Sequence, residues 1–324
     1  MKMNLTIPAV AAAFAAVLLA GSACQRRPLF LAENRARLEL TIHDTLPEIG
    51  LVACGNLYET RLYDKSTGRL AETSYTGLRG GEINVPAGSY DLVCCTFDTE
   101  SVVFSEEDRK ETLTASTNPA YVATADLYRT VVRAADLDTD RNLEALPVCG
   151  QPDPLFSATV RDLVVPFRDE SDETFVIAAD AWPMFRCGRV LASGVTGQEY
   201  LSGATAFLSG VAAGCSLADG CLLPDPSVLN IPLDKTPGQQ CLQASFNTFG
   251  FLPETANHLF LLLTDTEGGR YLFHFDVTDQ CSRNRGVVII RVDLDFDVPE
   301  PAHGGGGFSP SVDDWNVVIH PVNL

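Results

Sequence analysis

The histidines of this 324-residue chain stand in none of the spacings that build a catalytic or metal-binding centre. They are His43, His258, His274, His303 and His320. The sequence has no HExxH zinc motif, no GxSxG nucleophile turn and no Walker-type phosphate loop. We expect His43 at a strand end and His274 within a strand, both as structural residues. The sequence therefore predicts no catalytic residue, and we expect the protein not to be an enzyme.

Acidic residues offer the next candidate chemistry. The segment 136–140, Asp-Leu-Asp-Thr-Asp, has the spacing that opens a calcium loop. An EF-hand then requires glycine at its sixth position and glutamate at its twelfth, where this chain has Arg141 and Pro147. Asp293, Asp295 and Asp297 are explained as the solvent-facing positions of one strand. We expect no metal ion and no cofactor.

The cysteines could form disulfides or remain small buried apolar residues. No CxxC pair occurs, and Cys94 and Cys95 are adjacent, so on a strand they would point to opposite faces. Cys215 and Cys221 flank a short turn and form the most plausible local disulfide. The remaining cysteines fit burial as small apolar side chains equally well.

One cysteine stands where covalent lipid attachment occurs. Residues 1–23 form a signal peptide with Lys2, an apolar run and the small residues Gly21-Ser22-Ala23 before Cys24. The run contains Pro8 and is shorter than the roughly 20 residues that span a bilayer. We therefore expect a bacterial lipoprotein whose Cys24 carries the lipid, held in the outer membrane. A plain signal peptide with an incidental cysteine is the alternative.

The overall charge excludes one class of partner. The chain has 42 acidic and 23 basic residues and no basic cluster, whereas nucleic-acid binding needs concentrated lysine and arginine. With 46% hydrophobic residues it is a globular rather than a disordered chain. We expect no nucleic-acid partner.

Alternation of apolar and polar residues indicates strands throughout. It is clear at residues 38–42 and 292–298. Hairpin turns are predicted at residues 64–68, 86–88 and 265–269. Helical spacing is limited to residues 127–135 and a short segment near 105–108. The sequence predicts an all-β protein of two tandem β-sandwich domains.

The predicted domain limits follow from composition. Residues 24–35 form a lipidated linker, residues 36–165 the N-terminal sandwich and residues 166–324 the C-terminal sandwich. The boundary is set near residue 165 because prolines and acidic residues make the stretch 150–173 resemble a loop.

The C-terminal segment 308–324 follows the glycine run 304–307 and alternates like a strand. It is either the last strand of its own domain or a strand that a neighbouring subunit receives. The donor-strand candidates are Trp315, Val317, Ile319, Val322 and Leu324.

Several segments together resemble the anchor subunits of Bacteroidales fimbriae, the fimbrillin-related lipoproteins of type V pili. They are Cys24 with 26–29, the strand 37–40, the hairpin-like 85–92, the segments 200–204 and 208–212, 246–250, 275–278 and 313–315. The order of these segments, rather than any single one, carries the resemblance. Length and lipid signal favour the anchor of minor, short fimbriae.

The resemblance implies two transthyretin-like sandwiches and assembly by strand exchange. In stalk and tip subunits of that family, an arginine-specific protease removes the first strand and opens a groove for a neighbour's C-terminal strand. The anchor is understood to escape this cut. Here the residues 38–42 would close the groove, and the C-terminal strand would be donated to the first stalk subunit, a fimbrillin. Arg35 and Arg37 make cleavage chemically feasible, whereas Pro28 should protect Arg27.

Two alternatives remain open besides a lipid-held fimbrial anchor. A stalk or tip subunit would lose its N-terminus after Arg35 or Arg37. A surface glycan-binding lipoprotein would use exposed aromatic residues, yet Trp182 and Trp315 are the only tryptophans, which does not suggest a platform of several rings.

Overall fold

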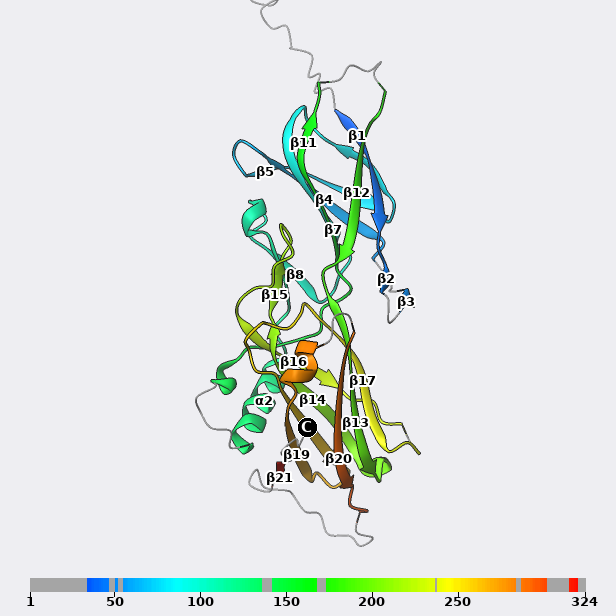
Figure 1. Cartoon of the computed structure of the whole chain (residues 1–324), viewed down its shortest axis with the longest axis vertical. Coiled ribbons are helices and arrows are strands. Elements are labelled where there is room, and N and C mark those ends of the chain that lie inside the picture. The colour runs from blue at the N-terminus through cyan, green and yellow to red at the C-terminus, as the bar shows by residue number, and fades with distance from the viewer. Residues whose placement is uncertain are drawn as a thin grey trace, which may run out of the picture.

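The computed structural model describes residues 34–46, 50–51, 55–135, 142–167, 173–236, 238–283, 287–301 and 315–319. The described chain is elongated, with one β unit toward each end of its long axis (Figure 1). Strands dominate, which confirms a mostly β protein, and the helix expected at 127–135 is α2 (Val122–Ala134). None of the helices in these ranges is long and apolar enough to cross a bilayer. Cys24, the acidic segment 136–140, the glycine run 304–307, Val322 and Leu324 lie outside the described residues.

The first unit is a closed barrel in the order β1-β12-β11-β7-β4-β5-β6. Its strands are β1 (Arg35–Ile42), β4 (Leu57–Asp64), β5 (Leu70–Gly77), β6 (Gly80–Asn84), β7 (Gly88–Thr96), β11 (Phe156–Val165) and β12 (Phe175–Pro183). Two of its seams are narrow, with one residue pair between β5 and β6 and two pairs between β11 and β12. The three strands β6-β1-β12 therefore form one wall and β5-β4-β7-β11 the other. The apolar core between them includes Leu38, Leu92 and Phe156. A short ladder, β2 (Thr45–Leu46) with β3 (Gly50–Leu51), follows β1.

The predicted hairpin at residues 86–88 is wrong. β6 pairs with β1 and β5, whereas β7 pairs with β4 and β11, so the segment crosses from one wall to the other. The Val85 N–H donates to the Asn34 carbonyl over 2.8 Å, which keeps the end of β6 beside the entry to β1. The other two predicted turns are confirmed, since 64–68 joins β4 to β5 and 265–269 joins β18 to β19. A period-two pattern identifies the strands but does not identify their partners.

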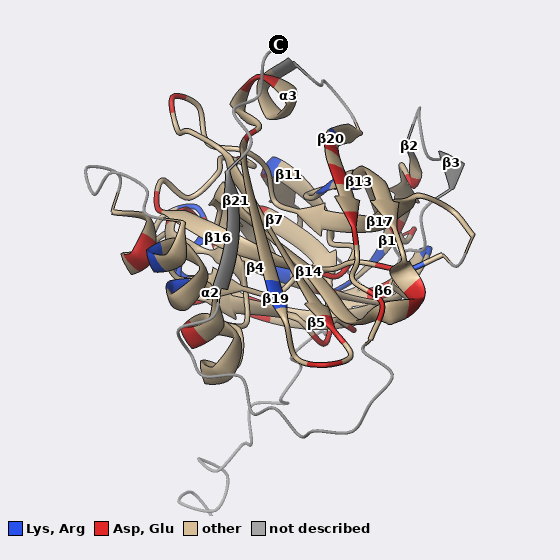
Figure 2. Ribbon diagram, turned by 90° about the horizontal axis from the view of Figure 1, so that it is seen from below, with Lys and Arg blue, Asp and Glu red and all other residues tan. Residues whose placement is uncertain are grey.

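The second unit is built from two facing sheets. The larger has the order β10-β16-β14-β18-β19-β21, with β10 (Val148–Cys149), β16 (Pro226–Pro232), β14 (Leu201–Ala212), β18 (His258–Asp265), β19 (Arg270–Asp276) and β21 (Trp315–Ile319). The smaller contains β17 (Cys241–Thr248), β13 (Arg186–Thr196) and β20 (Val288–Asp297). Apolar residues of both sheets form the core, and α2 packs on the other face of the larger sheet (Figure 2). Along β20 the odd-numbered aspartates point outward while Val292 and Leu294 are buried, as the alternation predicts.

A third region lies between the two units. The other short elements of the chain are the 3-10 turns η1 (Lys110–Thr112), η3 (Leu143–Ala145) and η4 (Gln198–Tyr200) and the helix α3 (Thr278–Arg283). In this third region, the strands β8 (Val102–Ser105), β9 (Thr114–Thr117) and β15 (Gly214–Ser216) form a small sheet. Its buried cluster combines Tyr63 and Val93 of the barrel with Ala212 and Phe249 of the second unit. Continuous apolar packing therefore joins the two units.

The chain passes between the units more than once. The stretch 150–173, expected to be a loop, contains the strand β11, and β12 also belongs to the barrel. Conversely, α2 and β10 precede residue 165 and pack with the second unit. The predicted domain limit at residue 165 stays a proposal.

Candidate subunit-contact strands

Strand β1 is the central strand of one barrel wall. It pairs in parallel with β12, from Ala36 opposite Phe175 to Ile42 opposite Ala181. On its other side it pairs antiparallel with β6, from Arg35 opposite Asn84 to Glu39 opposite Gly80. Its inward side chains Ala36, Leu38 and Leu40 are 1%, 1% and 8% exposed. Both backbone edges and the inward face of β1 are thus occupied.

The approach of β6 to β1 depends on Gly80. Its φ of +85° lies in the region that favours glycine, and an added Cβ would lie 2.1 Å from the Leu38 carbonyl oxygen. The turn that precedes β6 therefore brings its backbone directly against β1. Only a residue without a side chain fits there.

The two arginines of β1 project into solvent. The Arg35 Nη1 lies 3.5 Å from Glu82 Oε2, and the Arg37 Nε lies 3.5 Å from Glu39 Oε1. All four side chains are more than half exposed, so these ion pairs contribute little to stability. The arginine side chains are therefore accessible to a protease. The backbone around them is paired on both sides, whereas a protease needs an extended, unpaired segment.

Strand β21 occupies the edge of the larger sheet in the second unit. Its backbone pairs in parallel with β19, from Trp315 opposite Arg270 to Ile319 opposite His274. Among the described strands, β19 alone is its partner. In the isolated chain the predicted donor residues 315–319 are therefore an edge strand of their own sheet. Their side chains and the rest of 308–324 lie outside the described residues.

Two histidines meet close to that edge. The His258 Nδ1 lies 3.0 Å from the His274 Nε2, and the His274 ring stacks on Phe260 with a centroid distance of 4.9 Å. Within the described part of the chain, no group of three histidine, cysteine or acidic side chains could hold a metal ion. His274 is thus packed among aromatic rings, as expected of a structural residue.

The predicted disulfide between Cys215 and Cys221 is wrong, since both are free thiols. Cys215 lies opposite Leu222, and the Ser216 N–H donates to the Cys221 carbonyl over 2.8 Å. The backbone of Cys221 is therefore bonded to Ser216, the residue after Cys215. Because adjacent strand positions point to opposite faces, this arrangement does not bring the two sulfur atoms together. Cys215 is buried in the cluster between the units, whereas Cys221 is exposed.

Buried charges fix the segment between the units onto the barrel. Arg61 and Glu59 of β4 are 1% and 4% exposed, and the Arg61 Nη2 lies 2.7 Å from Glu59 and 2.8 Å from Glu107. Burial raises the pKa of Glu59, although Arg61 opposes that change. The Arg61 guanidinium also lies over the Phe104 ring at 5.1 Å. This cluster holds β8 and the following turn against β4.

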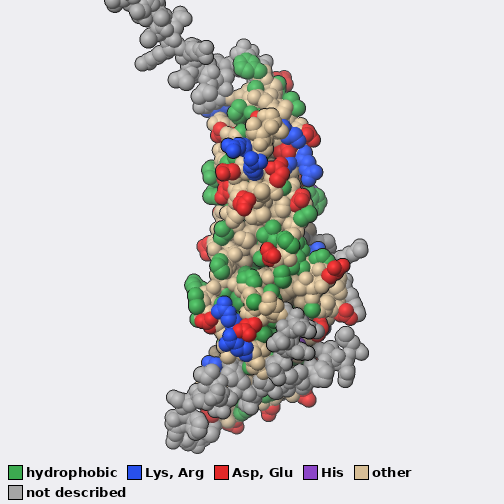
Figure 3. Space-filling model, turned by 90° about the vertical axis from the view of Figure 1, so that its left-hand side faces the viewer, with side chains coloured by type: hydrophobic (Ala, Val, Ile, Leu, Met, Phe, Trp, Pro, Cys, Tyr) green, Lys and Arg blue, Asp and Glu red, His purple; other side chains and the backbone are tan. Residues whose placement is uncertain are grey.

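The sequence did not reveal one surface feature. Trp182, an exposed residue of β12, stacks on His43 with a centroid distance of 3.7 Å and an angle of 4°. The His43 Nε2 lies 3.1 Å from Asp180 Oδ1. The alternation of β12 predicts an outward Trp182, but a pattern along one strand does not show that His43, 139 positions away, is its neighbour. The face in Figure 3 carries acidic and basic side chains intermixed, with no broad basic patch.

Solved structures share this fold at low identity. A crystal structure of an adhesin candidate from Bacteroides ovatus aligns with a TM-score of 0.57 and 17% identity, over 90% of this chain and 94% of that one. A polysaccharide-binding candidate (DUF1812) from Bacteroides thetaiotaomicron aligns with a TM-score of 0.50 and 13% identity, over 80% and 90%. The fimbrial anchor protein Mfa2 from Porphyromonas gingivalis aligns with a TM-score of 0.49 and 14% identity, over 80% and 90%. The first two establish a similarity of fold.

The sequence itself identifies the family. No curated protein matches the chain. A family pattern described as a domain of unknown function (DUF5119) matches residues 59–234, from β4 of the barrel to the end of β16 in the second unit. Because this pattern covers more than half of the 324 residues, the chain belongs to the DUF5119 family.

Proposed function

We propose that this protein is a lipid-held cell-surface subunit that anchors a fimbria to the outer membrane. Cys24 carries the lipid, the barrel stays closed by its own first strand, and the segment 308–324 is donated to the first stalk subunit. The adhesin character of the Bacteroides ovatus relative supports a surface role. The resemblance of the sequence to fimbrial anchor subunits supports the more specific one.

The observation that carries the proposal is the placement of β1 between β6 and β12. A subunit that accepts a neighbour's strand needs an open groove, and this barrel has its central position filled. As long as β1 is retained, such a subunit can donate a strand but cannot receive one there. It therefore ends the fibre, and a lipid on the N-terminal side of β1 would make that end the base.

The positions of β1 and β21 along the molecule are consistent with this role. β1 enters the barrel at one end of the long axis, and β21 lies near the other end (Figure 1). A membrane attachment before β1 and a subunit contact at β21 would therefore act at opposite ends. Tension along a fibre would then be carried through the apolar cluster that joins the two units.

The first test is the N-terminus of the mature protein, determined by mass spectrometry of outer-membrane extracts from its own host. We expect a lipidated Cys24 followed by an intact Arg35-Ala36-Arg37 segment. An N-terminus at Ala36 or Leu38 without lipid would identify a processed stalk or tip subunit instead and would refute the anchor role.

Two variants separate the two attachments. Cys24→Ala should release whole fibres into the medium, whereas deletion of residues 308–324 should leave the protein in the membrane without an attached fibre. Cell-bound and released fibres are counted by electron microscopy, and the protein is followed by fractionation. Fibres that stay on cells carrying Cys24→Ala would contradict tethering, and fibres retained after the deletion would place the subunit contact elsewhere.

A further inference from the structure

A groove opens in the barrel where β11 and β12 diverge. These strands form only two residue pairs, Phe156 with Pro183 and Ser157 with Trp182, and then separate. The groove of about 570 Å³ is lined by both strands and by the turn 217–220, which follows β15 of the small sheet between the units. The Thr159 Oγ1 donates to the Leu217 carbonyl over 3.5 Å, which holds that turn over β11. Two parts of the fold thus build one concave surface.

The indole of Trp182 lines one side of this groove. Strand β12 has β1 on one side and β11 on the other, so Trp182 lies between His43, which follows β1, and Ser157 of β11. His43 covers one indole face. Because Trp182 nevertheless remains 56% exposed, its other face is accessible. An indole fixed on one face and open on the other is suited to stacking on a flat apolar surface.

Ser157 adds an unused hydrogen-bonding group. Its residue is only 7% exposed, and its Oγ has no hydrogen-bond partner within the described part of the chain. A buried hydroxyl without a partner is unfavourable, and such groups are rare in folded proteins. Ser157 also lines the groove, so a ligand hydroxyl that reaches its Oγ would supply the missing bond.

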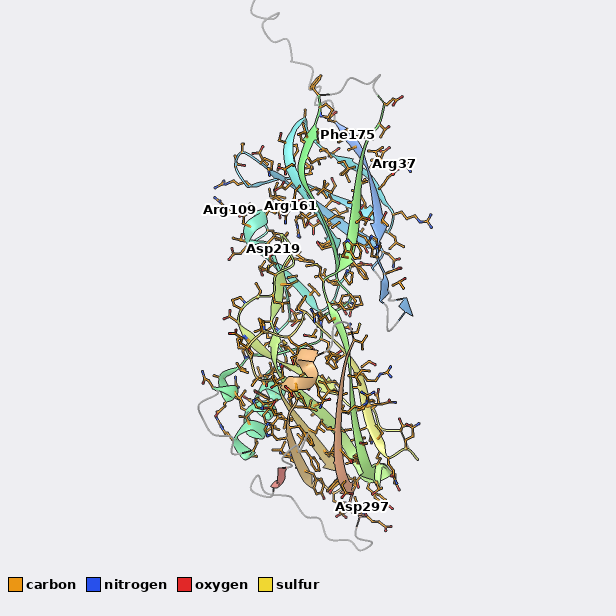
Figure 4. All side chains as sticks on the ribbon, viewed as in Figure 1. Arg37, Arg109, Arg161, Phe175, Asp219 and Asp297 are labelled. Carbon is orange, nitrogen blue, oxygen red and sulfur yellow. The ribbon has the colours of Figure 1, made fainter. Side chains whose placement is uncertain are left out.

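Charged groups line the rest of the groove. They are Asp180 and Asp219, with Arg161 on a β-bulge between Val160 and Leu163 (Figure 4). The Asp180 carboxylate is oriented by His43, and the Asp219 Oδ1 accepts the Cys221 N–H over 3.1 Å. Two carboxylates and one guanidinium give acceptors and donors with a net negative charge. This combination suits a neutral ligand rich in hydroxyls and disfavours an anionic one.

We propose that this groove binds a neutral hexopyranose unit of an oligosaccharide. The apolar C–H face of the sugar stacks on the open face of Trp182, and its hydroxyls bond to Ser157, Asp180, Asp219 and Arg161. A single aromatic ring with a few polar groups in a groove of this size fits one sugar residue with its neighbours extending into solvent. The site is independent of strand donation, because it uses neither β21 nor the lipid.

The test uses the full mature chain without lipid, made with Cys24→Ala, and Trp315→Phe so that Trp182 is the only tryptophan. Lactose, cellobiose, maltose and mannobiose are titrated while Trp182 fluorescence and saturation-transfer NMR of the sugar protons are recorded. We expect at least one disaccharide to bind with Kd on the order of 1 mM, as weak single-residue recognition allows. The saturation transfer should be strongest at the C–H protons of one sugar face.

Variants then assign the site. In the chain that keeps Trp315, Trp182→Ala should weaken binding at least roughly tenfold and Ser157→Ala about threefold, measured by NMR. Tyr121→Ala removes an aromatic residue that is 88% exposed and outside the groove, and it should leave binding unchanged. Circular dichroism checks that each variant is folded, and Asp219→Asn, at an exposed turn, replaces any variant that is not.

Three results would overturn the proposal. No binding of any of the four disaccharides at about one hundred times the expected Kd would exclude a neutral sugar. Equal binding by folded Trp182→Ala would place the sugar elsewhere. Tighter binding of sialyllactose than of lactose would show that the groove prefers an anion.

Discussion

Strands β1 and β21 share an alternating sequence pattern but are held in opposite ways. β1 has a partner on each side, and its inward residues are buried in the barrel core. β21 pairs with β19 alone, at the edge of its sheet. The alternating pattern therefore predicts only that a segment forms a strand. The position of the strand in its sheet, central or at the edge, decides whether it can separate from that sheet. We expect β1 to be permanent and β21 to be exchangeable.

The outer faces of the two units also differ. On the barrel, the segment 107–112 around η1 is held by ion pairs, namely Glu107 with Arg61 and Lys110 with Asp91. On the second unit, α2 covers the larger sheet through apolar residues such as Tyr128, Val131 and Phe260. Attachment by charges depends on pH, whereas attachment by apolar contact does not.

The largest effect is expected from Leu38→Ala. This side chain is 1% exposed in the barrel core, and removing such a leucine costs about 3 kcal/mol of the free energy of unfolding. Urea unfolding is followed by Trp182 fluorescence in a Trp315→Phe background, which reports on the barrel. The exposed neighbour Glu39 gives a matched control, since Glu39→Ala should change stability by less than about 0.5 kcal/mol. A loss below that of the control would mean that β1 does not close the barrel.

Much of this architecture follows from the sequence, and the missing part has a physical cause. Period-two alternation located β1 and β20, turn residues located the turns at 64–68 and 265–269, and helical spacing located α2. The 86–88 segment and the stretch 150–173 were misread because local turn residues do not tell which strands pair. Trp182 with His43 was missed for the same reason, because β12 pairs in parallel with a strand far away in the chain.

Gly80→Ala should lower the free energy of unfolding by about 2 kcal/mol, because it disturbs the pairing of β1 with β6. Its new Cβ would lie 2.1 Å from the Leu38 carbonyl oxygen, and φ is +85°. Gly77, at the opposite end of the same turn, has nothing within 4 Å of an added Cβ and provides the control. Equal effects of the two substitutions on the urea midpoint would show that the close approach of β6 to β1 is not required.

Lys110→Met tests the attachment of the η1 segment to the barrel by charges. It should lower the free energy of unfolding by about 1.5 kcal/mol near neutral pH. Burial alone would raise the pKa of Asp91, but the Lys110 ammonium and the Asp162 N–H hold it below its usual range. A lowered carboxyl pKa contributes stability above the unfolded pKa of about 4 and loses it as the pH falls through the folded pKa. The difference between variant and parent should therefore shrink below about pH 4. A difference that stays constant from neutral to acid pH would argue against this ion pair.

The smallest effect is expected from deleting residues 308–324. A strand that is to be donated must leave β19 at little cost, and one partner at a sheet edge provides few bonds to break. We expect the free energy of unfolding to fall by less than about 1 kcal/mol, and the amides of 315–319 to exchange with solvent at least roughly tenfold faster than those of 36–41 in the intact chain. Urea unfolding and hydrogen exchange by mass spectrometry measure the two quantities. A loss as large as that of Leu38→Ala, or equal protection of both strands, would make β21 as permanent as β1, and the protein would then need another segment to hold a fibre.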